Sequence, residues 1–153
     1  MREILFRGKR IDTGAWVEGD LVQGVNDQKG HMFIWSENDE SILGVVEFEV
    51  DPETVGQYTG LPDRNGKKIF DGDLLNGFEY PYLRDNAHNY FAEVVWFDNC
   101  PAFGLYTHKH PLSAVRGISA GNCEIIEDFD SSQWEIIGNI HDNPELLEGA
   151  GTE

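Results

Sequence analysis

Residues 55–75 read VGQYTGLPDRNGKKIFDGDLL, and this stretch decides the fold. Its DRNG segment, Asp63–Gly66, is a turn signal, because Asp and Asn hydrogen-bond to nearby backbone and Gly adopts a positive φ without a steric penalty. Apolar residues precede and follow the turn, and Gly72 suits a bulge or bend where a small sheet turns a corner. The stretch therefore predicts a strand, a tight turn and a second strand that enters a barrel-like sheet.

An outline of the same pattern appears nearer the N-terminus. Residues 6–22 contain an aromatic-x-Gly unit, the turn DTG and the run WVEGDLV, and residues 58–75 contain YTG, DRNG and IFDGDLL. One interpretation is a single hairpin design used once in each half of the fold. The other is convergence of two hairpins on one favourable turn chemistry. The sequence leaves both interpretations open.

Alternating and apolar runs predict further strands along the chain. The predicted strands cover residues 4–9, 16–22, 32–35, 45–50, 74–78, 90–97, 102–108, 123–126 and 134–140. Asn143 is typical of a helix N-cap and Pro144 of a first helical position, which predicts a short helix there. With 40% hydrophobic residues and 17 Gly in 153 residues, the composition indicates a folded, mainly β protein.

Charge is distributed unevenly along this acidic chain. The formal net charge is −17, and no Lys or Arg follows Arg116. Direct binding to a nucleic-acid backbone is therefore disfavoured, because phosphate contacts need Lys and Arg. An acidic surface that favours solubility is one interpretation, and mimicry of nucleic acid toward a host DNA- or RNA-binding protein is the other. The second interpretation predicts an acidic face formed by Glu124, Glu127, Asp128, Asp130 and Glu135.

No arrangement typical of catalysis or cofactor binding is present in the sequence. His108 and His110 share a strand face, but no Cys-x-x-Cys or His-x-x-x-His spacing accompanies them. Cys100 has no cationic neighbour to lower its pKa, and Cys123 lies in an apolar run. Acidic residues follow the glycine-rich residues 117–121, and they would repel phosphate. We therefore expect no catalytic residues, no metal and no cofactor.

Hydropathy, the N-terminal residues and the cysteines together indicate the cellular compartment of the protein. No apolar run approaches the roughly 20 residues that a membrane helix needs, and the first ten residues lack a secretory signal's apolar segment. Two cysteines without a disulfide framework favour a reducing environment. We expect a cytoplasmic protein that does not bind membranes.

Four stretches, in this order and spacing, carry a resemblance that covers nearly the whole chain. They are REILFRGKRIDTGAWVEGDLV, VGQYTGLPDRNGKKIFDGDLL, AEVVWFD and WEIIGNIHDNPELLE. Together they resemble the YopX family of bacteriophage and prophage proteins. The resemblance implies a phage-derived protein of unknown function with a small SH3-like β-barrel, and it carries no catalytic residues over to this chain. The expected organisation is an N-terminal β-hairpin region (1–54), the SH3-like barrel (55–142), and a short helix with a frayed tail (143–153), in one compact unit.

Function stays open between three classes. The first is a non-enzymatic adaptor that binds a host or phage protein through exposed aromatic residues. The candidate contact residues are Tyr80, Tyr82, Tyr90 and Trp96. Tyr90 and Trp96 share a strand face, so they have the alternative role of filling the core. The second class is the acidic inhibitor, and the third is an enzyme, for which no constellation is found. Edge strands also make a homo-oligomer possible.

Overall fold

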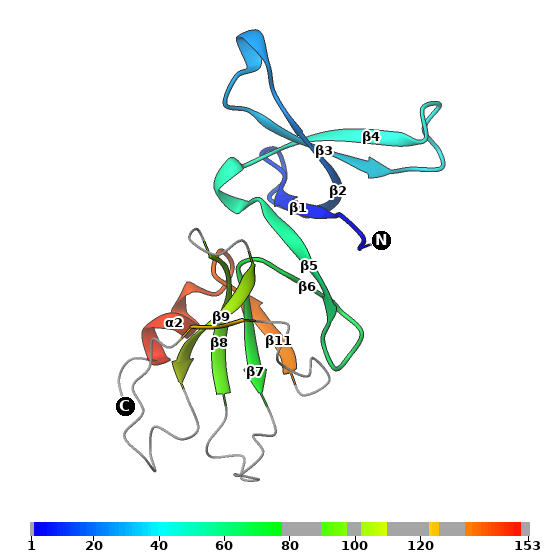
Figure 1. Ribbon diagram of the computed structural model, residues 1–153. Helices are drawn as coiled ribbons and strands as arrows, with labels where there is room; N and C mark the ends of the chain where they lie inside the picture. The colour runs from blue at the N-terminus through cyan, green and yellow to red at the C-terminus, as the bar shows by residue number, and fades with distance from the viewer. Residues whose placement is uncertain (1, 78–89, 98–101, 110–122, 126–133, 151–153) are drawn as a thin grey trace. The chain divides into compact units, whose positions relative to one another are not determined.

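The fold is seen in a computed structural model that describes residues 2–77, 90–97, 102–109, 123–125 and 134–150. The chain divides into two compact units, Met1–Gly60 and Leu61–Glu153. Figure 1 shows the first unit in blue to cyan and the second in green to red. Both are built mainly from antiparallel strands.

Four strands and two short 3-10 helices make up most of the N-terminal unit, and they form two consecutive hairpins. The elements are β1 (Phe6–Lys9), β2 (Trp16–Gln23), η1 (Asn26–Gln28), β3 (Met32–Glu37), β4 (Val45–Val50) and η2 (Pro52–Thr54). The strand order β4-β3-β2-β1 continues through β5 (Gly56–Pro62) to β6 (Lys68–Phe70), and β5 carries the chain across the unit boundary.

The first sheet curls because β2 changes partner along its length. Residues up to Gly19 pair with β1, and residues from Asp20 onward pair with β3. At the far end of the sheet, β4 meets β1 through a bridge between Arg10 and Val50. The Ile11 N–H donates to the Glu49 carbonyl at 3.0 Å within this contact. The four strands therefore wrap around a small interior.

Side chains from β3, β4 and β5 fill the interior of the N-terminal unit. Ile34, Val50 and Tyr58 are buried there. Gly8 lies against Val50, where an added Cβ would approach the Val50 Cβ to 2.9 Å. A residue without a side chain is thus needed at position 8 for the close packing of β1 on the end of β4.

The C-terminal unit contains a second sheet and a short helix. Its strands are β7 (Asp73–Gly77), β8 (Tyr90–Trp96), β9 (Phe103–Lys109), β10 (Cys123–Ile125) and β11 (Trp134–Asn139), and the helix is α2 (Pro144–Ala150). The strand order is β10-β9-β8-β7-β11, so a four-stranded meander has its fifth strand beside the first. β11 pairs with β7 antiparallel, with a register shift between Ile136 and Gly138.

One apolar cluster holds the second sheet together. Its buried members are Ile69, Leu75, Ala92, Val94, Phe103, Leu105 and Trp134. Leu61 and Ile136 pack against this cluster from partly exposed positions. The members come from β6, β7, β8, β9 and β11, so the cluster forms only when strands distant in sequence pair.

The structure confirms the predicted mainly β fold and the short helix that begins at Pro144. The predicted SH3-like β-barrel is not found as a closed barrel among the described residues. There the second sheet has two edges, β10 and β11, and β10 pairs only with β9 over three residues. A closed barrel would need these two edge strands to pair with each other. Curling is instead seen in the N-terminal unit, at the bridge between Arg10 and Val50.

The two echoed segments agree in their turns and differ after them. Gly14 and Gly66 each lie in a hairpin turn with a positive φ, 72° and 80° respectively. The following acid-Gly-Asp segments diverge, because Gly19 lies within β2 whereas Gly72 lies in a turn between β6 and β7.

Candidate functional site

The outward face of the N-terminal sheet carries an exposed tryptophan between two carboxylates. The register places Asp20 of β2, Trp35 of β3 and Glu47 of β4 in one row across the sheet. Opposite residues in an antiparallel pair project to the same face. The Trp35 Nε1–H donates to Glu47 Oε2 at 2.6 Å, and 43% of Trp35 remains exposed. The indole is thus fixed in orientation and accessible to a partner.

Basic side chains on the same face lie over a different aromatic ring. The Arg7 guanidinium carbon is 4.7 Å from the centroid of the Trp16 ring, and Lys9 Nζ is 5.6 Å from it. Both distances are typical of cation–π contacts. The cations of β1 therefore gather at Trp16, while the row through Trp35 is acidic.

The loop between β3 and β4 presents two aliphatic side chains to solvent. Ile42 is fully exposed, at 103% of its reference area, and Leu43 is 84% exposed. Backbone hydrogen bonds hold the loop, from the Asn38 N–H to the Gly44 carbonyl at 2.9 Å and from the Gly44 N–H to the Ser41 carbonyl at 3.0 Å. The Ser41 hydroxyl also donates to the Val45 carbonyl at 2.8 Å. Exposed apolar groups on an internally bonded loop are typical of a contact site, because little ordering is needed on binding.

At the opposite end of this hairpin, an imidazole pairs with a carboxylate. His31 Nδ1 lies 2.5 Å from Glu49 Oε1, and both side chains are substantially exposed. Glu47 and Glu49 are two residues apart on β4, so the two carboxylates lie on the same face of the sheet.

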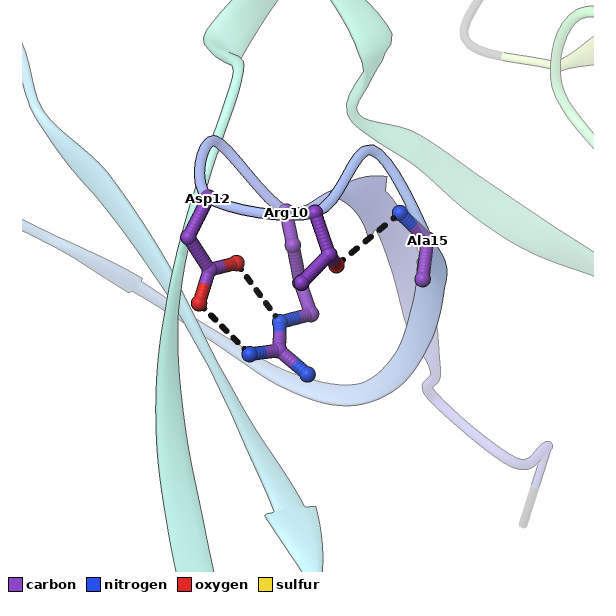
Figure 2. A network of polar contacts seen from close by, with 4 residues as sticks. Arg10, Asp12 and Ala15 are labelled. Carbon is purple, nitrogen blue, oxygen red and sulfur yellow. Dashed lines mark hydrogen bonds and ion pairs between the residues drawn. The ribbon is translucent and has the colours of Figure 1, made fainter.

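Figure 2 shows a second polar network, at the turn between β1 and β2. The Arg10 fork donates to both oxygens of Asp12, from Nε at 2.8 Å and from Nη2 at 2.6 Å. The Ala15 N–H donates to the Thr13 hydroxyl oxygen at 3.2 Å. The hydrogen bond from Arg10 lowers the pKa of the Asp12 carboxyl below its ordinary value. Arg10 also lies 4.3 Å from the Phe48 ring centroid, so the turn is tied to β4.

Replacing Arg10 by glutamine is expected to raise the midpoint of Asp12 titration toward that of a free carboxyl. The folded-state pKa is the lower one, so the pair stabilises the fold above the unfolded-state pKa, and this contribution is lost as pH falls through the folded-state value. Carboxyl-carbon NMR titration measures the midpoint directly. Arg10→Lys, which keeps the charge without the fork, should give an intermediate value, and an unchanged midpoint in Arg10→Gln would contradict the assignment.

Two of the four predicted aromatic contact residues lie on β8. Tyr80 and Tyr82 fall outside the described residues, and Tyr90 begins β8. Trp96 ends β8 with 44% of its area exposed, and its ring meets the buried Phe103 edge-on at a centroid distance of 4.9 Å. Trp96 thus packs at the rim of the core while part of it faces solvent, and its contact with a partner stays a prediction.

The predicted acidic face is only partly described. Glu127, Asp128 and Asp130 lie outside the described residues, and Glu124 lies on β10. Glu135, on β11, accepts a hydrogen bond from Asn65 Nδ2 at 3.2 Å. The face therefore stays a prediction.

The candidate chemical residues are likewise dispersed. His108 lies on β9 and Cys123 on β10, while Cys100 and His110 fall outside the described residues. Within the described part of the chain, no three His, Cys, Asp or Glu side chains are placed to hold a metal ion. No helix there is long and apolar enough to span a bilayer.

Trp35, Ile42 and Leu43 are the surface residues that sequence reasoning missed. The run MFIWSE in β3 has apolar side chains on both faces, so its pattern does not reveal which face is open to solvent. Ile42 and Leu43 follow a polar stretch, and an apolar pair in such a position is equally typical of a strand start.

Comparison with known proteins identifies the family. The model of the family described as YopX protein matches residues 5–148 of this chain. The chain belongs to the YopX family. The crystal structure of protein EF1440 from Enterococcus faecalis is similar, with 21% sequence identity and a TM-score of 0.49, over 96% of this chain and 99% of that one. No curated protein matches the chain.

Two of the four stretches that carry the YopX resemblance, the central and the closing motif, meet in the C-terminal unit. Asp63, in the central motif, is buried and accepts three backbone hydrogen bonds. Its Oδ1 accepts from the N–H groups of Asn65 at 2.8 Å and Lys67 at 2.9 Å, and its Oδ2 accepts from Ile136 at 3.1 Å. The Arg64 N–H donates to the Trp134 carbonyl at 2.8 Å. The central YopX turn is thus bonded to the strand of the closing motif.

The closing YopX motif is held by its own asparagines. Asn139 Oδ1 accepts from the N–H groups of His141 at 3.0 Å and Asp142 at 2.9 Å. Gly138 leaves room for Asn143, because an added Cβ would lie 2.4 Å from Asn143 Oδ1. The Ile140 N–H donates to the Gly72 carbonyl at 2.9 Å, and this hydrogen bond joins the closing motif to the bend at Gly72 in the central motif. These motif residues therefore have structural roles in the fold.

Proposed function

We propose that this YopX protein is a non-enzymatic protein–protein interaction module, whose contact element is the hairpin of β3 and β4. The exposure of Ile42 and Leu43 on an internally bonded loop carries this proposal. Apolar anchors at the centre of a contact are typically surrounded by polar groups. On the same hairpin, Trp35 provides an aromatic anchor, and the carboxylate of Glu47 that holds its indole is a polar group beside it.

The roles of the motif residues support a non-enzymatic function. Asp63 uses its carboxylate to join a turn to β11, and Asn139 uses its amide to hold the turn before α2. Side chains that already hydrogen-bond to the protein's own backbone are poor candidates for proton transfer or nucleophilic attack, because both reactions require contact with a substrate. The C-terminal unit is then a scaffold in this proposal.

An SH3-like fold of that scaffold, and a phage origin, belong to the same proposal. The order β10-β9-β8-β7-β11, a meander with its fifth strand returning beside the first, supports an SH3-like arrangement. Family membership supports an accessory role in the cytoplasm of a bacterial host, with a host or phage protein as partner.

Replacing Ile42 and Leu43 together by serine is expected to abolish capture of the partner and to leave thermal stability within about 2 °C of the wild type. Exposed side chains contribute little to folding, so binding and stability should separate. The measurement is affinity capture from bacterial lysate with quantitative mass spectrometry, beside a thermal melt of each protein.

Ile11→Ser provides a matched control, because Ile11 is also an exposed aliphatic residue of the N-terminal unit, at 59%. It should retain the same partner as the wild type. Retention of that partner by the Ile42→Ser/Leu43→Ser variant would contradict the proposed contact element.

A further inference from the structure

The free edge of β4 has an orientation that the hydrogen bonds determine. In an antiparallel strand, the N–H and C=O of one residue point to the same side, and the side alternates along the strand. The Glu49 carbonyl accepts from Ile11, on the side of β4 away from β3. The N–H and C=O of Glu47 therefore also point away from β3. Since β4 is the terminal strand of the described sheet, they point to its open edge.

Only a short part of this edge is open. The bridge to Arg10 covers β4 at Val50, and the Ser41 hydroxyl already bonds to the Val45 carbonyl. The Val45 N–H and both backbone groups of Glu47 still point away from β3, to the open edge of the sheet. An added strand would therefore pair over about three residues, and side-chain contacts would have to supply the remaining affinity.

The hairpin beside this edge has a charge of one sign. Residues 32–50 contain Glu37, Asp39, Glu40, Glu47 and Glu49 and no Lys or Arg. On the outward face, Glu47 lies next to the exposed Trp35, and Asp20 lies on the far side of that indole. A cation next to Glu47 would meet a carboxylate and an aromatic ring together.

The same charges argue against a second copy of this chain at the edge. Two β4 strands paired antiparallel over Val45–Glu47 would bring the Glu47 carboxylates of the two copies opposite or diagonal to each other. Like charges directly opposite each other across two strands are destabilising. A nucleic acid would be repelled for the same reason. The complementary occupant is an extended polypeptide with basic side chains.

We infer that the open edge of β4 at Val45–Glu47 binds an extended basic segment of the partner protein as an added strand. Lysine or arginine at alternate positions lies on the outward face beside Glu47 and Trp35. The intervening residues lie on the other face, beside the half-buried Val46, where apolar side chains fit. The inference rests on the proposed function, and it names the chemistry of the partner.

The test uses two capped eight-residue peptides, one alternating Lys and Val and the other alternating Glu and Val. Each is titrated into the ¹⁵N-labelled full-length protein and followed by NMR. The Lys–Val peptide is expected to shift the amide signals of Val45–Glu47 and the Trp35 indole signal, with affinity that falls as salt rises. Equal binding of the Glu–Val peptide, or shifts confined to residues outside 32–50, would overturn the inference.

Two variants separate charge from backbone pairing. Glu47→Gln should weaken Lys–Val binding about fivefold, as expected for the loss of one cross-strand ion pair. Glu53→Gln, which removes an exposed carboxylate on η2 of the same unit, should leave binding unchanged. Val45→Pro keeps the carboxylates and removes the outward N–H, so it should also weaken binding. Unchanged affinity in both Glu47→Gln and Val45→Pro would overturn the inference.

The two proposals fail in distinguishable ways. If the Lys–Val peptide does not bind while the Ile42→Ser/Leu43→Ser variant still loses its captured partner, the basic-strand inference is wrong and the interaction module stands. If that double variant keeps the partner while the peptide binds at β4, the proposed contact at the loop is wrong.

Discussion

Replacing Asp63 by alanine is expected to lower the free energy of unfolding by about 3 to 5 kcal/mol. Asp63 is only 5% exposed, and its carboxylate accepts backbone hydrogen bonds from Asn65, Lys67 and Ile136. Each bond to a charged acceptor contributes about 1.5 to 3 kcal/mol, and the N–H of the half-buried Ile136 would also be left without this partner. The bond to Ile136 joins residues 73 apart in sequence, so its loss also loosens β11 from the DRNG turn.

Urea denaturation followed by tryptophan fluorescence and circular dichroism measures this change. Asp63→Asn should lie between the wild type and Asp63→Ala, because its Oδ1 still accepts from two N–H groups while its amide nitrogen meets the Ile136 N–H. Lys67→Ala, an exposed change in the same turn, should stay within about 0.5 kcal/mol of the wild type. A loss below about 1 kcal/mol in Asp63→Ala would show that the carboxylate does not hold the turn.

Replacing Gly19 by alanine is expected to destabilise the N-terminal unit by about 3 kcal/mol, the upper end for overpacking. Its added Cβ would lie 2.0 Å from the Trp35 carbonyl oxygen and 2.7 Å from the Trp35 carbonyl carbon. These are backbone atoms of β3, which cannot move aside without disturbing the pairing of Asp20 with Trp35. The expected loss of stability therefore arises because β2 changes its partner from β1 to β3 at Gly19, where the backbones of β2 and β3 approach closely.

The same unfolding measurement applies to Gly19→Ala, with the adjacent exposed change Glu18→Ala as its control. Glu18→Ala should change stability by less than about 0.5 kcal/mol. The Gly19→Ala variant should also lose partner capture, because a shift of the Trp35 backbone moves the hairpin of β3 and β4. Wild-type stability in Gly19→Ala would contradict the described passage of β2 between its two partners.

The turns of this protein could be predicted from sequence because their interactions are local. Asp63 bonds to Asn65 and Lys67, within four residues, and residue types alone indicate such contacts. Its bond to Ile136 depends on strand pairing across the unit, which no local pattern specifies. The open edges of the second sheet escaped prediction for the same reason. Strand existence follows from periodicity, whereas closure depends on which strands meet at the edges.

The candidate contact surface was harder to predict than the fold. The pattern of β8 predicts Tyr90 and Trp96 as aromatic residues of a strand, and the Trp96 ring both packs on Phe103 and remains 44% exposed. Trp35 has similar surroundings in sequence, and only the register with Asp20 and Glu47 shows that it faces outward. Ile42 and Leu43 are recognisable as exposed only after the hydrogen bonds of residues 38–45 define the loop.

Amide hydrogen exchange of the full-length protein, alone and bound to its captured and purified partner, tests the proposed contact most directly. Slowed exchange is expected in residues 38–47, which include the loop with Ile42 and Leu43 and the open edge of β4. Protection confined to β8–β11 or to the acidic segment 124–135, with exchange in residues 38–47 unchanged, would contradict a contact through the β3–β4 hairpin.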